Sequence, residues 1–188
     1  AFENKINQLK KEIEMGLGLL SFYKKLNKLV SSIGCGHIRI DLPKKRKQIL
    51  LDSIKYLPFN IFLRSNQLVV LNDFKQITVG SVIHSMNGVH AMEIIQELRS
   101  IIPSDGYNVT GKDYYINKKF KELYAMNFSI NNTTIEMTYS DVENGTKRSI
   151  NIGLIPYDEM GGQINKKSKF LKLTELNKRT KMISIKTF

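Results

Sequence analysis

The spacing of apolar residues changes once along this chain, and that change sets the limits on how it can fold. Over residues 2–33 apolar side chains recur every three or four positions, as in amphipathic helices. From Leu57 onward many of them recur at every second position, as in half-buried strands. We therefore expect an α+β fold, in which a helical segment precedes a small sheet accompanied by one or two helices.

Glycines and prolines divide the first part of the chain. Gly16 and Gly18 interrupt the apolar stripe, so two helices are expected instead of one. Gly34 is well placed to end the second helix. The alternating residues 38–42 predict a short strand, and residues 46–54 predict a short helix.

The second part of the chain predicts a series of strands and helices. Asn87–Gly88 and Asn144–Gly145 both have the composition of hairpin turns. We expect strands at 57–63, 68–71, 82–86, 134–140, 148–155 and 182–188, helices at 91–101 and 117–125, a polar loop at 103–117, and a linker at 156–169.

Composition excludes several classes of function. The net charge is +12, but no aromatic residues alternate with the basic runs and no DNA-binding motif is present, so nucleic-acid binding is not expected. A single cysteine excludes an internal disulfide and a cysteine-cage zinc site. Three histidines without HExxH spacing argue against a zinc hydrolase, so we predict no metal and no cofactor. No apolar run is long enough to span a bilayer.

Few residues are plausible catalytic groups. Ser21 and Lys24 match Ser-x-x-Lys, but they lie in an amphipathic helix without the partner motifs. His84 lies in a predicted strand and is interpreted as a residue that packs or faces solvent. Cys35 lies between two glycines and is interpreted as a small buried filler. Asp105 and Asp113 have no clear metal-ligand spacing. His37 follows a Gly-x-Gly turn at the predicted start of a strand, where general bases are common and where an imidazole can equally cap a carbonyl group.

Four segments, taken in order, resemble the front half of the C-terminal processing (tail-specific) serine peptidases, and in particular their tricorn-like bacterial branch. They are the turn Gly34–Ile38, the Leu57–Phe59 strand start, the loop Ser104–Thr110 and the core-opening strand Met182–Phe188. Between them, Gly80–Gly88 resembles the hairpin of PDZ domains. Cys35 stands where the family usually has an acidic residue, and Ile38 where it has threonine.

The resemblance implies a helical segment at 1–42, a PDZ-like small barrel or sandwich at 43–156, and a linker with the first strand of a peptidase core at 157–188. It implies that this chain is the non-catalytic half of a serine endopeptidase located outside the cytoplasm, in the periplasm or cell envelope. The partners implied are peptide or protein C-terminal tails and the core domain, which would follow residue 188 and carry the nucleophilic serine.

The same resemblance implies roles for individual residues. His37 would be the general base that serves the core serine. A peptide would add to the edge of strand 57–63 beside helix 91–101, with Leu57, Phe59, Ile61 and Ile95 as the expected contacts. The alternative is a stand-alone peptide-binding or scaffold module without enzymatic activity.

Overall fold

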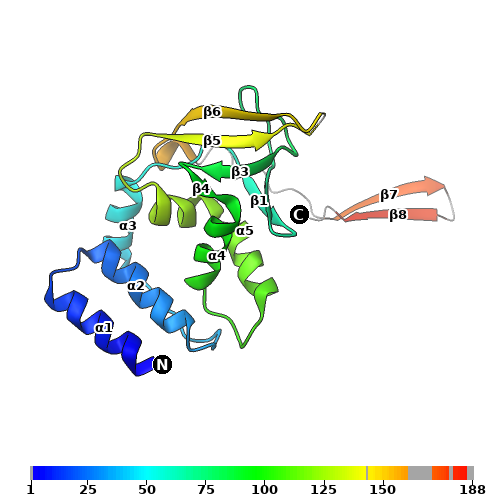
Figure 1. Ribbon diagram of the computed structural model, residues 1–188. Helices are drawn as coiled ribbons and strands as arrows, with labels where there is room; N and C mark the ends of the chain where they lie inside the picture. Colours follow the sequence, from blue (N-terminus) through cyan, green and yellow to red (C-terminus); the bar gives the residue numbers. More distant parts are fainter. Residues whose placement is uncertain (1, 143, 161–170, 178–179, 186–188) are drawn as a thin grey trace.

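The computed structural model describes residues 2–142, 144–160, 171–177 and 180–185, the last two ranges by their backbone alone. An antiparallel helical hairpin, α1 (Phe2–Glu14) and α2 (Leu19–Ser31), precedes α3 (Lys44–Ser53) and a mixed region of strands and helices (Figure 1). The expected α+β class is confirmed. Among these residues, every helix is too short or too polar to cross a membrane.

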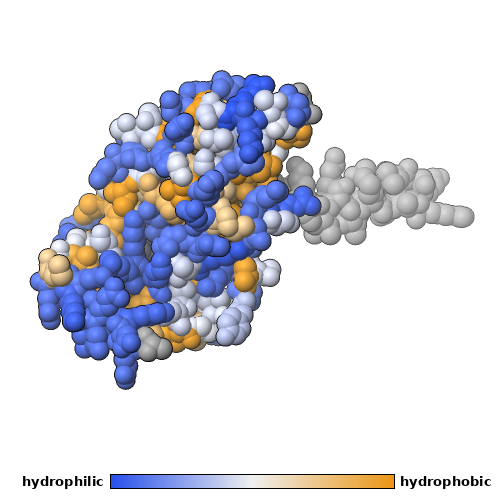
Figure 2. All heavy atoms as spheres, in the orientation of Figure 1, coloured by the Kyte–Doolittle hydropathy of each residue, from blue (hydrophilic) through white to orange (hydrophobic). Residues whose placement is uncertain are grey.

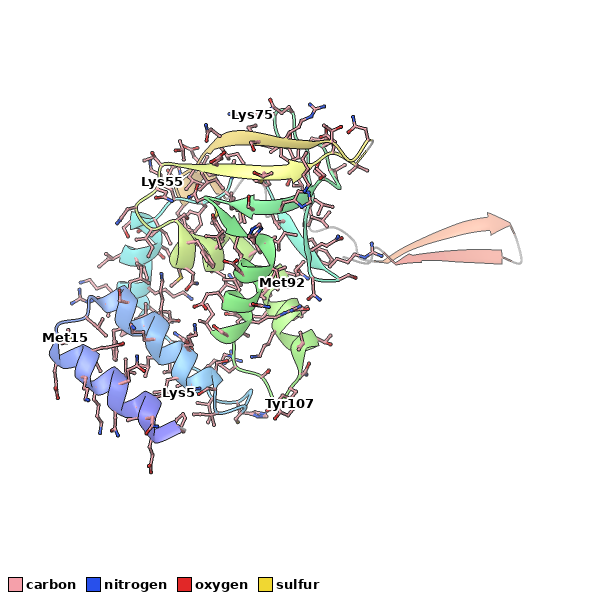
Figure 3. The ribbon with its side chains drawn as sticks, in the orientation of Figure 1. Lys5, Met15, Lys55, Lys75, Met92 and Tyr107 are labelled. Atoms are coloured by element: carbon pink, nitrogen blue, oxygen red, sulfur yellow. The ribbon has the colours of Figure 1, made fainter. Side chains whose placement is uncertain are left out.

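The two N-terminal helices form where the sequence predicted them. Gly16, with φ of +87°, allows the turn between α1 and α2, and Gly34, with φ of +73°, follows the end of α2. Hydrophilic side chains cover most of the visible face of this hairpin (Figure 2). Met15 lies exposed in its connecting turn (Figure 3).

The central sheet is antiparallel and open, with β1 and β6 at its two edges. Its strands follow the order β1-β2-β3-β5-β6, and the short β4 pairs with β3. The bounds are β1 Ile61–Arg64, β2 Gln67–Val70, β3 Val82–Met86, β4 Val89–His90, β5 Thr134–Ser140 and β6 Lys147–Gly153. A lone bridge between Tyr56 and Ile155 joins the segment before β1 to the segment after β6, but the sheet does not close into a barrel.

Helices α4 (Ala91–Ser100) and α5 (Val109–Phe128) cover one face of this sheet (Figure 1). On β5 the residues Ile135, Met137 and Tyr139 are buried toward the helices, whereas Thr134 and Glu136 face solvent. This alternation is the one that the sequence predicted, and it places the main core between sheet and helices.

Three predicted elements differ from the structure. Residues 38–42 form no strand, because no neighbouring strand pairs with them; the Tyr23 hydroxyl donates instead to the Ile40 carbonyl, at 3.3 Å. β1 is confined to Ile61–Arg64 instead of starting at Leu57. α5 occupies much of the predicted loop 103–117, because the Asn108 side chain accepts a hydrogen bond from Gly111 N–H and caps its first turn.

A separate two-stranded antiparallel sheet follows. It pairs β7 (Leu171–Asn177) with β8 (Thr180–Ile185). The predicted strand 182–188 coincides with β8 up to residue 185, and its last three residues lie outside the described part of the chain, as does most of the predicted linker. β7 was not predicted.

Candidate functional site

A cavity of about 160 Å³ lies where α2, the irregular segment 39–42 and α5 meet. Aliphatic side chains form a large part of its wall: Ile40, Leu42, Ile101, Ile102, Leu123 and Met126. Cavities that combine an apolar wall with a few polar groups are the usual binding sites of small ligands. The cavity is therefore the strongest candidate binding site among the described residues.

Positive side chains outnumber negative ones around this cavity. The charged lining residues are Lys24, Arg39, Lys47 and Lys119 against Asp41 and Glu122. Lys119 is already paired with Glu122, at 2.8 Å. Burial lowers the pKa of Lys119, but the hydrogen bond to Glu122, the charge of that carboxylate and the nearby Tyr115 and Tyr157 together outweigh burial and leave the pKa raised.

Lys24 is the most distinctive of these cations. It projects from α2 and is half-buried, and its Nζ donates to the backbone carbonyl of Asn127 on α5, at 3.2 Å. Burial lowers the pKa of Lys24, and the attraction of Glu97 offsets only part of that effect. A bound anion would favour the charged form of this lysine.

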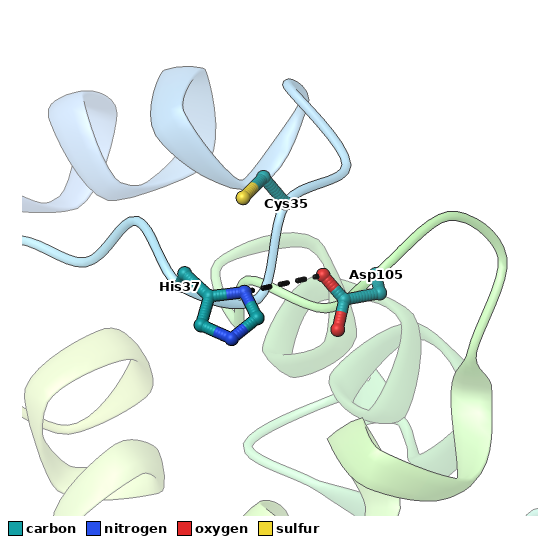
Figure 4. Close-up of side chains that lie close together, drawn as sticks. All are labelled: Cys35, His37 and Asp105. Atoms are coloured by element: carbon teal, nitrogen blue, oxygen red, sulfur yellow. Dashed lines mark ion pairs between the residues drawn. The ribbon is translucent and has the colours of Figure 1, made fainter.

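The turn that carries His37 forms part of the cavity rim, because Gly36 lines the cavity. His37 is itself 90% exposed, and its Nδ1 lies 3.9 Å from Oδ1 of Asp105, which is 70% exposed (Figure 4). Cys35 approaches the same two groups. The His37 ring is thus exposed, whereas its role as a base stays a prediction.

Backbone contacts bring the two loops of this cluster together. Gly106 N–H donates to the Gly34 carbonyl at 2.9 Å, and Gly36 N–H donates to Asp105 Oδ1 at 2.8 Å. A Cβ at position 36 would lie 3.2 Å from Asp105 Oδ2, so the glycine permits this close approach. Asp105 is a member of the cluster that sequence reasoning missed, because 69 residues separate it from Gly36.

The residues predicted to contact a peptide lie elsewhere. Leu57, Phe59, Ile61 and Ile95 are between 0% and 3% exposed and all belong to the main core. In this structure none of them is available to a peptide, because the alternation that marked them as strand and helix residues also turned them inward. Residues 57–60 also lie outside β1.

The predicted edge is already hydrogen-bonded at its centre. Asn117, which α5 places beside β1, accepts from Leu63 N–H at 2.6 Å and donates to the Leu63 carbonyl at 3.1 Å. These are the backbone groups that an added peptide strand would use there. The helix beside this edge is thus α5 and not the predicted helix 91–101.

His84 lies in β3, within the strand predicted for it. The register of β3 against β5 shifts between Ile83 and Ser85, which leaves His84 as the extra residue of a β-bulge. Its Nε2 shares a hydrogen bond with Ser140 Oγ, and burial, followed by the nearby Lys147, lowers the pKa of His84. Neither His84 nor Ser140 lines the cavity, so we interpret this pair as a cross-strand contact.

No known protein-family model matches this sequence, and no curated protein is significantly similar to it. The resemblance to tail-specific peptidases therefore depends on the four sequence segments alone.

Proposed function

We propose that this chain binds the C-terminal tails of peptides or proteins, as the non-catalytic part of a serine-type peptidase. Its tail-binding site is the cavity between α2, residues 39–42 and α5, in place of the β1 edge that the PDZ-like pattern indicated. The order of the four peptidase-like segments supports the class of substrate. The apolar wall of the cavity and its excess of positive side chains support the assignment of the cavity as the binding site.

The observation that carries this proposal is the half-buried Lys24 in a largely apolar cavity. A terminal carboxylate is the anion that an apolar peptide end brings with it. Lys24 would receive this carboxylate from one side, and Arg39, an exposed lining residue, would approach from the rim. The last side chain of the tail would pack against Ile40 and Met126.

We propose further that His37 acts as general base toward a serine of a core domain in the intact enzyme. Its exposure makes the ring accessible to another domain. Asp105 lies on the Nδ1 side of the ring, where a carboxylate orients the imidazole and leaves Nε2 to take the proton. The chain by itself is then expected to hydrolyse no peptide.

The test is a binding titration with a fluorescent peptide that ends in apolar residues, prepared as the free acid and as the C-terminal amide. We expect the acid to bind roughly tenfold or more tightly, the usual contribution of a charge-assisted hydrogen bond. Lys24→Met should remove most of this preference, leaving only the part that Arg39 contributes. Lys25→Met is the matched control, because the neighbouring Lys25 pairs with Glu12 on α1 at 2.8 Å and does not line the cavity.

Two results would contradict the proposal. One is equal affinity of the unmodified chain for the acid and the amide peptide, which would mean that no cation binds the terminal carboxylate. The other is an acid preference of undiminished size in Lys24→Met while the melting temperature shows that the variant is folded.

A further inference from the structure

Three side chains of different chemistry converge beside the cavity. The Cys35 sulfur, a ring nitrogen of His37 and a carboxylate oxygen of Asp105 all lie within 4.8 Å of one another (Figure 4). Two come from the turn after α2 and the third from the loop before α5. Their convergence is a tertiary feature, which explains why sequence spacing predicted no metal site.

We propose that Cys35, His37 and Asp105 bind a divalent transition-metal cation, with Zn²⁺ as the best match. Thiolate, imidazole and carboxylate are the three ligand types that zinc takes in proteins. Bond lengths of about 2.0–2.1 Å around a tetrahedral ion separate a nitrogen and an oxygen ligand by about 3.3 Å. The observed 3.9 Å between His37 Nδ1 and Asp105 Oδ1 is close to this value, and exposed side chains can make the remaining adjustment by small rotations.

The backbone around the cluster suits a metal site. The hydrogen bonds Gly106–Gly34 and Gly36–Asp105 fix the two loops against each other, so the ligands start near their bound positions. Gly36 N–H donates to the carboxylate, which is the kind of outer contact that orients metal ligands. Three protein ligands leave a fourth position for water or another ligand.

The orientation of the His37 ring favours metal binding by the three side chains over a catalytic triad in which the Cys35 thiol is the nucleophile. Such a nucleophile needs one ring nitrogen on the thiol and the other on the carboxylate. Figure 4 shows Nδ1 on the side of the ring that faces Cys35 and Asp105, and Nε2 pointing away from both. A single nitrogen directed toward both partners is the arrangement that a shared cation requires.

Metal binding stands apart from the proposed peptide function, because it is measured on this chain without any peptide or core domain. A cation on Nδ1 would keep the proton of His37 on Nε2, so a metal-bound His37 could not act as a base. If both proposals hold, Zn²⁺ would inhibit the intact enzyme. Either proposal can fail without the other.

The test is a Co²⁺ titration of the full chain, followed by competition with Zn²⁺. Since Cys35 is the only cysteine, a thiolate-to-cobalt charge-transfer band reports this residue alone. We expect one equivalent of Co²⁺ to saturate the band and Zn²⁺ to abolish it. Cys35→Ser should lose the band, His37→Ala and Asp105→Asn should each weaken binding by about tenfold or more, and His90→Ala, an exposed histidine on β4, should bind as the unmodified chain does.

Alkylation of the unmodified chain gives a second readout that needs no variant. Zn²⁺ should slow the reaction of Cys35 with iodoacetamide, and lower pH should weaken this protection, because protons compete for the thiolate and the imidazole. The absence of a thiolate band and of protection would overturn the proposal. So would Co²⁺ binding that persists unchanged in His37→Ala, since the ion would then lie elsewhere.

Discussion

The side chain of Asn117 holds the outer edge of β1 by hydrogen-bonding to both backbone groups of Leu63, at 2.6 and 3.1 Å. One amide thus replaces the neighbouring strand that an edge strand lacks. The contact ties α5 to β1 and prevents another chain from pairing at this point.

Replacing Asn117 tests that relationship. Asn117→Ala should lower the free energy of unfolding by about 2–3 kcal/mol, because it leaves the N–H and the C=O of a buried residue without their partner. Asn117→Asp keeps an acceptor for the N–H but cannot donate to the carbonyl, so its loss should be intermediate. Urea denaturation of the three proteins measures the order, and an unchanged midpoint for Asn117→Ala would contradict it.

Gly80 gives a prediction about a turn. Its φ is +90°, and a Cβ there would lie 2.9 Å from Cγ2 of Val142. Gly80→Ala should therefore cost about 2–3 kcal/mol through backbone strain and overlap together. In a Val142→Ala background the overlap is relieved, so the same substitution should cost about 1 kcal/mol less. Equal costs in the two backgrounds would show that Val142 gives way freely.

Stability should depend on alkaline pH in two opposite ways. Burial lowers the pKa of Lys121 to about 8, so between pH 8 and about 10 the unfolded chain binds a proton that the folded chain has released, and stability rises with pH. Burial raises the pKa of Tyr124 to about 12 and also raises that of Tyr56. Above about pH 10 the unfolded chain therefore loses protons that the folded chain keeps, and stability falls.

Thermal unfolding from pH 7 to 11 should show this maximum, with a rise of roughly 2 kcal/mol from Lys121. Lys121→Met should reduce the rise and leave the fall above pH 10 unchanged. Part of the rise will remain, because burial also lowers the pKa of Lys24 and Lys112. A rise of full size in Lys121→Met would contradict the assignment.

His37 should contribute little to stability. Its side chain is 90% exposed and its contact with Asp105 is 3.9 Å long. His37→Ala should shift the melting temperature by no more than about 2 °C. Asp105→Ala should have the larger effect, because Asp105 also accepts from Gly36 N–H. Unfolding of the His37 variant at ordinary temperature would instead show that the imidazole holds the turn.

The spacing of apolar residues was enough to predict the helices and strands that bury only one face. The strand Thr134–Ser140 and the helical hairpin follow directly from apolar spacing. Only residues 117–125 of α5 were predicted as helix, because α5 deviates from helical geometry at Lys119 and its apolar residues follow no single stripe. The PDZ-like resemblance marked Leu57 and Ile95 as peptide contacts, but apolar spacing could not distinguish a groove residue from a core residue.

The candidate site depends on contacts between distant segments. Cys35 and His37 both lie in the turn after α2, whereas Asp105 comes from a loop that only the folded chain brings near. The cavity likewise forms between α2 and α5. There the Nζ of the half-buried Lys24 donates to the backbone carbonyl of Asn127. Residue types could be read from the sequence, but their convergence is set by tertiary packing.

The most direct test of the account is a map of backbone amide chemical shifts during titration with the free-acid peptide. Binding in the cavity predicts changes at Asn27, Ile40 and Met126, which line it, and little change along Ile61–Arg64. The amide form of the peptide should produce smaller changes at the same positions. Changes that follow β1 instead, or no changes at millimolar peptide, would contradict the assignment of the cavity as the tail-binding site.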